Sequence, residues 1–335
     1  MVDDVHGAPV SGPPVNPMRH PSPHPTWKAG VRPRILPLPS PEQMQRLGRE
    51  RLNKVLQARE LALKLERVDP LWHGWVAPVW VLSWALLDVP WVDPELAAAI
   101  RRNLGFQKPL RVLVANGANR AGKSRWAACT IGRYLWPTIT PSMTPATVDR
   151  MKAFMERPRN TYCFQTTEKD SRDRQQPLLV EYMPPAIRAA ACSKKGFKSG
   201  NVGDIRYSVK NGFPDSLFVT PDGSRCDFRN YAAYSHDPMS IEGIEADAIW
   251  ADEPNQAELI KTLKGRITTR NGILVPTFTP IHGYTPAVRM FYASSRPVME
   301  SPAFLLPADG GEPDLEAAMY VEDLVWRALA EAPAP

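Results

Sequence analysis

The chain has 335 residues, of which 43% are hydrophobic, and its formal net charge is +6. This length allows one α/β domain of about 230 residues with appendages and leaves little room for a second full domain. The positive charge favours a polyanionic partner such as nucleic acid. The four cysteines are widely spaced and form no C-x-x-C pair, which argues against a zinc site and a disulfide framework. We therefore expect a protein of the reduced cytosol.

No segment is expected to cross a membrane. The longest apolar run, residues 75–87, contains Pro78 and is shorter than the roughly 20 residues that a spanning helix needs. No signal peptide is expected, because Asp3 and Asp4 open the chain and no apolar core follows them.

Composition divides the chain into four predicted parts. Residues 1–39 hold ten of the 36 prolines, which predicts a disordered tail. Residues 40–105 are expected to form a helix and a Trp-rich lid. Residues 106–290 are expected to form the nucleotide-binding core, and residues 291–335 a carboxyl-terminal extension.

The predicted first helix begins with a capping box. Ser40 is the expected N-cap, Pro41 the first helical residue and Gln43 the reciprocal cap, and the helix should end near Val68. Residues 46–67 carry seven basic and three acidic side chains. This face either is simply solvated or binds DNA or a partner subunit.

The Trp-rich lid, residues 70–94, holds five of the ten tryptophans. Packing of these rings against the core is the first hypothesis. Contact with an adenine ring by Trp72, Trp75, Phe106 or Gln107 is the second.

The central motif is the segment from Gly117 to Ser124, which matches G-x-x-x-x-G-K-[ST]. Its backbone N–H groups would surround the β-phosphate, Lys123 would reach the β- and γ-phosphates, and Ser124 would ligate Mg²⁺. Residues 112–115 predict a buried strand before this loop, and residues 126–135 predict a helix after it. We therefore expect ATP and Mg²⁺ as ligands. The predicted nucleotide contacts are Gly117, Ala118, Asn119, Arg120, Ala121, Gly122, Lys123, Ser124, Arg125, Thr277 and Thr279.

The segments that follow predict a second strand and an inserted ribbon. Residues 137–159 are expected to be irregular, residues 161–167 a strand and residues 175–182 a helix. Residues 194–227 predict an antiparallel β-hairpin ribbon with a turn at residues 211–212. Its lysines are Lys194, Lys195, Lys198 and Lys210. They either grip phosphates or keep a projecting hairpin soluble.

A second acidic motif follows the central one by about 130 residues. Residues 248–254 predict an apolar strand that ends in Asp252 and Glu253. Asp252 would hold Mg²⁺, and Glu253 would polarise the attacking water. The next predicted strand, residues 272–280, ends in Thr277 and Thr279, whose hydroxyls could sense the γ-phosphate.

Three arginines are candidates for stabilising charge in the transition state. Arg266 and Arg270 lie between the two strands, and Arg120 lies within the glycine-rich loop. Each could act in its own subunit or in a neighbour. A basic helix end favoured by the helix dipole is the alternative for Arg270.

Together these motifs resemble the ATPase domain of the large subunit of tailed-phage terminases. The resemblance runs from Asp69 to about Arg289, with its pieces in the family's order. The similar pieces are Asp69–Trp75, Asn116–Ser124, Gln175–Pro177, Phe228–Tyr231, Ile241–Gly243, Ile249–Glu253 and Thr277–Pro280.

The resemblance implies an ASCE-type P-loop NTPase, an α/β fold with a mostly parallel central sheet flanked by helices. It implies ATP hydrolysis that drives double-stranded viral DNA into a prohead. Lys123, Ser124, Asp252 and Glu253 would be the catalytic set, coupled to motion through the threonines. The implied partners are DNA, a terminase small subunit and further copies in a ring on the portal, in the host cytoplasm.

The chain departs from the family's pattern in two places. Some members carry an arginine just before the acidic strand, where this chain has Glu242, so that role falls to Arg266 or Arg120. Members usually continue into a nuclease domain, and the segment after Pro280 is too short to form one. Its aspartates are Asp309, Asp314 and Asp323. We expect a separate or missing nuclease, and cleavage of supercoiled plasmid by this chain would contradict that expectation.

Two rival functions remain open on the sequence alone. A superfamily 2 helicase-like ATPase shares the Asp-Glu pair but needs a second recombinase-like domain. A nucleotide-binding scaffold would bind ATP without turnover and organise partners.

Overall fold

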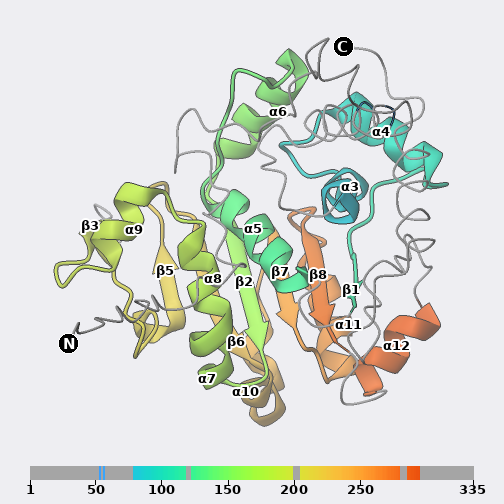
Figure 1. Cartoon of the computed structure of the whole chain (residues 1–335). Helices are drawn as coiled ribbons and strands as arrows, with labels where there is room; N and C mark the ends of the chain where they lie inside the picture. The colour runs from blue at the N-terminus through green and yellow to red at the C-terminus, as the bar shows by residue number, and fades with distance from the viewer. Residues whose placement is uncertain are drawn as a thin grey trace, which may run out of the picture.

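The centre of the computed structural model is a six-stranded sheet with the spatial order β1-β8-β7-β2-β6-β5 (Figure 1). Strands β1, β8, β7, β2 and β6 are parallel, and β5 at one edge is antiparallel to β6. The structure describes residues 53, 56, 78–117, 122–198, 204–279 and 285–294. The strands are β1 (Ala115–Asn116), β2 (Asn160–Gln165), β5 (Leu217–Val219), β6 (Arg225–Asn230), β7 (Ala248–Asp252) and β8 (Ile273–Phe278). This confirms the expected α/β fold with a mostly parallel sheet.

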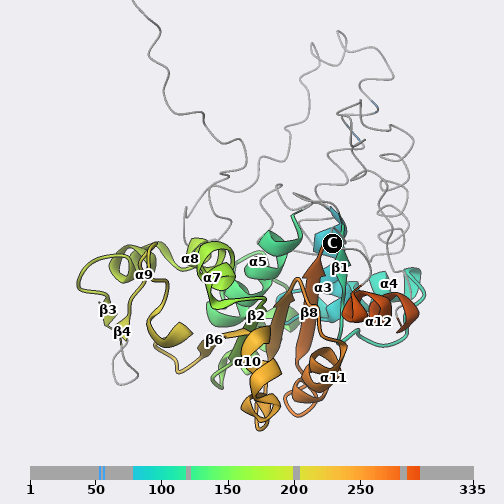
Figure 2. The same ribbon diagram turned by 90° about the horizontal axis from the view of Figure 1, so that it is seen from below.

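Helices cover both faces of the sheet, as the two views show (Figure 2). The first face carries α3 (Pro78–Leu87), α4 (Pro94–Asn103), α5 (Lys123–Leu135), α6 (Pro145–Met155) and α8 (Gln176–Glu181). The second face carries α10 (Tyr231–His236), α11 (Ala257–Arg266) and α12 (Pro286–Ser294). Strand β7 is apolar throughout because both faces are covered: Trp250 points to the first core and Ile249 to the second.

Short elements complete the described fold. They are α7 (Glu168–Asp170), the π-helical turn η2 (Ser171–Gln175), α9 (Pro185–Ala191), the paired strands β3 (Phe197–Lys198) and β4 (Asp204–Ile205), and the 3₁₀ turns η4 (Pro214–Ser216) and η5 (Pro238–Ile241).

The described tryptophans of the lid are core residues. Trp80 stacks on Trp126 of α5 with ring centroids 5.3 Å apart. The Trp84 indole donates a hydrogen bond to the Thr130 hydroxyl at 2.8 Å, and Trp91 packs edge-on against Trp84. The packing hypothesis is therefore confirmed for these rings, and α3 fastens the lid segment to α5.

The expectation of an irregular segment over residues 137–159 is wrong, because this segment contains α6. Thr144 is the N-cap, its hydroxyl accepts the Thr147 N–H, and Pro145 is the first helical residue. The Thr144 hydroxyl also donates to Asp93, the N-cap of α4, at 2.5 Å. The Thr-Pro start signal was present in the sequence.

The expected ribbon over residues 194–227 is correct only in part. The β5–β6 hairpin forms, with a turn in which Thr220 N–H bonds to the Ser224 carbonyl at 2.7 Å. However, β4 pairs with β3 and not with β5, and β6 joins the main sheet parallel to β2. Cys226 and Phe228 of β6 are buried in the first core, so this strand belongs to the sheet.

Several expectations fall outside the described residues. They concern the tail of residues 1–39, most of the helix of residues 40–68, Trp72, Trp75, and the extension beyond residue 294. The two described residues of that helix, Asn53 and Leu56, are helical. Within the described parts of the chain, each helix is too short or too polar to cross a bilayer.

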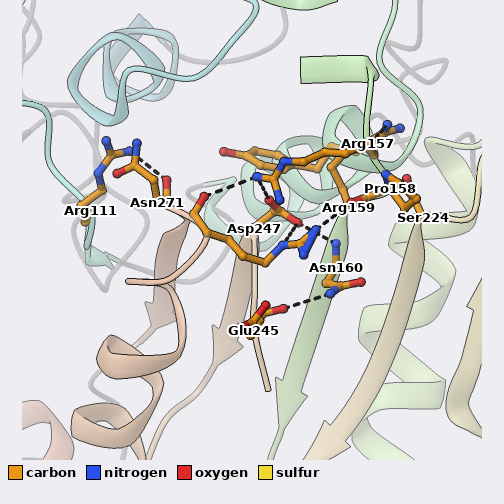
Figure 3. Close-up of polar contacts among 11 residues, drawn as sticks. Arg111, Arg157, Pro158, Arg159, Asn160, Ser224, Glu245, Asp247 and Asn271 are labelled. Carbon is orange, nitrogen blue, oxygen red and sulfur yellow. Dashed lines mark hydrogen bonds and ion pairs between the residues drawn. The ribbon is translucent and has the colours of Figure 1, made fainter. Parts of the chain in front are cut away.

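The amino end of β7 is held by a buried ion cluster (Figure 3). Asp247, just before the strand, is 3% exposed, and its carboxylate contacts Arg157 at 2.7 Å and Arg270 at 2.8 Å. The Asn160 N–H donates to the same carboxylate at 2.8 Å, which links the starts of β2 and β7. These partners give each oxygen of the buried carboxylate an ion pair or a hydrogen bond.

Candidate functional site

The candidate site lies at the carboxyl edge of the sheet, where β1, β8, β7 and β2 end together. Asn116 of β1 is in register with Phe278 of β8, and Asp252 of β7 is in register with Thr277 of β8. Strand β8 therefore lies between the strand that precedes the glycine-rich loop and the strand that carries the acidic pair. Ligands of parallel α/β sheets bind at such carboxyl edges.

Both ends of the glycine-rich loop are described, and its residues 118–121, which include Arg120, lie outside the described residues. Gly122 has a φ of +82°, a left-handed conformation that favours glycine. A Cβ on Gly122 would meet the Trp80 indole nitrogen at 3.5 Å, so the lid helix lies against the end of the loop. Helix α5 begins at the next residue, Lys123.

Lys123 is held inside the site and is only 6% exposed. Its ammonium group donates to the Gly117 carbonyl at 2.8 Å and to the Thr279 hydroxyl at 2.9 Å. Burial lowers the pKa of Lys123, and the nearby Glu253 and Asp252 carboxylates oppose that shift. Lys123, which follows the glycine-rich loop, thus contacts both the first residue of that loop, Gly117, and the residue after β8, Thr279.

Asp252 is surrounded by polar groups from three elements and is 7% exposed. Its carboxylate accepts hydrogen bonds from Gln165 at 2.8 Å, from the Thr277 hydroxyl at 2.5 Å and from Ser124 at 3.5 Å. The Thr277 hydroxyl is oriented by the Trp250 indole, which donates to it at 2.8 Å. Burial raises the pKa of Asp252, although these hydrogen bonds and Lys123 lower it.

Sequence reasoning did not find two contacts of Asp252. Gln165 binds its carboxylate, and the Tyr231 hydroxyl donates to its backbone carbonyl at 2.8 Å. Gln165 stands at the carboxyl end of the expected second strand, and that position was the available signal. Tyr231, which starts α10 after β6, lies in the segment Phe228–Tyr231 that resembles the terminase family, and that resemblance was its signal in the sequence.

Glu253 takes an unusual backbone conformation directly after β7. Its φ is +49°, in the left-handed region, which costs a residue with a side chain about 1 kcal/mol or more. The Glu253 N–H donates to the Thr277 carbonyl at 2.7 Å, and its carboxylate accepts the Thr279 N–H at 3.2 and 3.3 Å. These bonds hold the carboxylate toward the side of the site that Lys123 occupies.

The site offers oxygen donors of the kind that Mg²⁺ prefers. Ser124 and Asp252 converge with their side-chain oxygens 3.5 Å apart. Among the described residues, no three His, Cys, Asp or Glu side chains gather as a metal-binding group. Ser124 and Asp252 are the side chains that would hold a magnesium ion at this edge of the sheet, where it would supply positive charge to bound phosphates.

The other arginines proposed from the sequence are not brought to this edge. Arg270 is bound to Asp247, and Arg266 accepts the Ala246 N–H through its carbonyl at 3.0 Å, at the amino end of β7. One strand length, about 17 Å, separates that end from Asp252. Arg270 therefore has a structural partner, and the backbone of Arg266 lies about one strand length from Asp252. Arg125, predicted to contact nucleotide, forms an ion pair with Glu181 at 3.0 Å.

Comparisons of the chain with protein-family models, with curated proteins and with solved structures found no match.

Proposed function

We propose that this chain is a P-loop ATPase of the ASCE type and the motor part of a terminase large subunit. It hydrolyses ATP, and this hydrolysis drives the translocation of double-stranded DNA into a prohead. The observation that carries the proposal is the convergence of one ammonium and two carboxylates on the end of β8. Lys123 and Glu253 both bind Thr279, while Asp252 binds Thr277. This arrangement fits the binding and hydrolysis of a nucleoside triphosphate.

Lys123 supplies the positive charge for the phosphates. It is buried at the start of α5, where the helix dipole also favours an anion, and the glycine-rich loop precedes it. Its ammonium group is held by the Gly117 carbonyl and the Thr279 hydroxyl. Binding of a γ-phosphate would exchange the hydrogen bond with Thr279 for a stronger charge-assisted contact.

Ser124 and Asp252 would hold Mg²⁺, which when bound neutralises charge on the β- and γ-phosphate oxygens. Gln165 and Thr277 hold the Asp252 carboxylate in place through its two oxygens. Their role is to fix the carboxylate's orientation.

Glu253 would polarise the attacking water. Its carboxylate lies one residue beyond Asp252 and is bound by the Thr279 N–H. Thr279 contacts Lys123 through its hydroxyl and Glu253 through its backbone N–H. Release of the γ-phosphate would therefore alter both of these contacts of Thr279. That makes Thr279 the best candidate for passing the state of the nucleotide to a moving element.

The resemblance of the motifs to the terminase family is the basis for proposing three partners: double-stranded DNA, a ring of further copies on the portal, and a terminase small subunit. The overall charge of +6 supports a polyanionic partner.

The test is steady-state ATP hydrolysis by the full chain, with and without linear double-stranded DNA. Glu253→Gln should bind ATP and hydrolyse it at least about 100-fold more slowly, because general-base catalysis contributes roughly that much or more. Lys123→Ala should lose ATP binding. Glu258→Gln, which changes a 75% exposed carboxylate on α11, is the matched control and should behave as the parent chain.

Turnover by Glu253→Gln at the parental rate would refute the assignment of Glu253. ATP binding by the parent chain without turnover, even with DNA present, would refute the motor and favour a nucleotide-binding scaffold.

A further inference from the structure

A basic insertion projects from the edge of the molecule beyond β5 and β6. We define it as residues 185–198 and 204–216, which include α9, β3 and β4, and both views show these elements standing away from the sheet (Figures 1 and 2). The insertion has six basic and two acidic side chains, a net charge of +4 within a chain whose total is +6. Charge of one sign is therefore concentrated on a projecting element.

Two turns present the lysines of the insertion to solvent. In the first, Gly196 N–H bonds to the Ser193 carbonyl at 3.2 Å, and Lys194 and Lys195 are its exposed central residues. In the second, the Ser208–Gly212 bridge closes a loop with exposed Lys210 near its tip. The neighbouring Val209 is 86% exposed, so this tip stands clear of the protein.

The two turns are close enough to contact one stretch of duplex. The Tyr207 N–H bonds to the Ala191 carbonyl at 2.9 Å, and each turn's lysines begin three residues beyond that bond. Three residues span at most about 10 Å, so the lysine backbones lie within about 25 Å of each other. One helical turn of B-DNA is about 34 Å long.

The base of the insertion is fixed to the sheet. Phe213 packs against Phe218 and Phe228 with ring centroids 4.6 and 5.5 Å apart. Its N–H donates to the buried side chain of Gln176 at 2.9 Å. A rigid base lets the turns contact a ligand without first being ordered, which lowers the entropy cost of binding.

Next to Gln176 in the chain, a short series of contacts leads toward the candidate site. The preceding residue, Gln175, donates to the Phe164 carbonyl at 3.3 Å, and the next residue of β2 is Gln165, which binds Asp252 at 2.8 Å. Gln175 and Gln176 lie at the junction of η2 and α8, and π-helical turns are frequent at functional sites.

We propose that the two turns of the basic insertion bind the phosphate backbone of double-stranded DNA. The choice of DNA rests on the proposed function, whereas the surface rests on the charge, exposure and spacing of Lys194, Lys195 and Lys210. Backbone binding of this kind is sequence-independent and weakens steeply with salt.

The test is binding of a fluorescent 30-base-pair duplex by the full chain without nucleotide, followed by anisotropy over a range of salt concentrations. The test variant replaces Lys194, Lys195 and Lys210 with alanine. The control variant replaces three exposed lysines outside the insertion, Lys108, Lys152 and Lys261, with alanine.

The test variant should reduce the slope of log K against log salt by about 2 to 3, because each phosphate contact contributes about 0.9 to that slope. At 0.1 M salt, a slope change of this size corresponds to a loss of duplex affinity of roughly 100- to 1,000-fold in the test variant, and the control should bind as the parent chain does. Equal binding by the test and control variants, or no duplex binding by the parent chain, would overturn the proposal.

Equal affinity of the parent chain for single-stranded and duplex DNA would overturn the assignment to duplex. Duplex binding that depends on these lysines in a chain that hydrolyses no ATP would support the surface and refute only the proposed motor.

Discussion

Two aspartates lie at opposite ends of β7 and show how one residue type can serve two purposes. Asp247 and Asp252 are both buried, at 3% and 7% exposure. Asp247 is bound by two arginines and a backbone N–H. The Asp252 carboxylate accepts hydrogen bonds from the Gln165 amide and from the Thr277 and Ser124 hydroxyls. The nearby Lys123 ammonium donates to the Thr279 hydroxyl. Two cations bind Asp247 directly, whereas the groups that hydrogen-bond to the Asp252 carboxylate are neutral and Lys123 lowers its pKa from nearby.

This difference in charge balance has a physical consequence. A buried carboxylate between two guanidinium groups has little left to bind, whereas a carboxylate held by neutral donors remains costly to ionise. The raised pKa of Asp252 reflects that cost, with burial as its main cause. A magnesium ion, when bound, would add positive charge to that of Lys123 beside this carboxylate. Asp247 therefore has a structural role, and the partners of Asp252 favour a role in the proposed magnesium site.

The largest expected effect is on stability, from Asp247→Asn. The change leaves Arg270, with an 18% exposed side chain, without its charged partner, and it should lower the free energy of unfolding by about 3 kcal/mol or more. Urea denaturation measures this loss. Asp149→Asn is the matched control, because Asp149 is 79% exposed in a surface pair with Lys152, and it should cost less than about 0.5 kcal/mol.

A loss no larger than that of the Asp149 control would mean that Asp247 is not needed to hold the amino end of β7.

The two arginines of this cluster should differ in importance. Arg270 is 18% exposed and also donates to the Pro158 carbonyl at 2.8 Å, whereas Arg157 is 48% exposed. Arg270→Ala should cost about 2 kcal/mol, and Arg157→Ala about 1 kcal/mol or less, because water can replace the more exposed partner. Thermal or urea unfolding of the two variants checks the order.

Arg270→Ala also tests the catalytic hypothesis for that arginine. ATP turnover per folded molecule should be unchanged, since Arg270 lies at the end of the sheet away from the candidate site. A loss of turnover by roughly 1,000-fold or more with unchanged stability would instead support an arginine that acts in catalysis, which is the size of effect known for such residues.

The sequence predicted the parts of this comparison that depend on local pattern. The sequence predicted two apolar strands that end near Asp252 and Thr277, and because parallel strands end at the same edge of a sheet, these two residues lie at one carboxyl edge. The sequence also predicted the helix that begins at Lys123. Strand β1 was less well predicted: it covers Ala115–Asn116, and the residues before it run beside β8 with only isolated bonds, such as Leu113 N–H to the Leu274 carbonyl at 3.1 Å.

The parts that depend on strand order could not be predicted. Asp247 pairs with Arg157, which is 90 residues away in the chain. Gln165 binds Asp252, which is 87 residues away. The pairing of β6 with β2 likewise joins distant segments in parallel. No local periodicity encodes which strand lies beside which, so these contacts appear only in the fold.

Asp252→Asn should change stability less than Asp247→Asn does, and the sign of the change should be opposite. Because the folded-state pKa of Asp252 is raised above its ordinary value of 3.8, the native state binds a proton at a higher pH than the unfolded state does. The parent chain therefore gains stability as the pH falls through the raised pKa toward 3.8, and the asparagine variant does not.

Asp252→Asn should accordingly be more stable than the parent chain at pH 7, and this advantage should shrink as the pH is lowered through that window. Urea denaturation at several pH values measures it. The order should reverse when Mg²⁺ and ATP are added, since ligand binding to the native parent chain adds stability that the variant cannot gain. A variant as destabilised at pH 7 as Asp247→Asn would show that both carboxylates serve the fold, and the site would then lack its metal ligand.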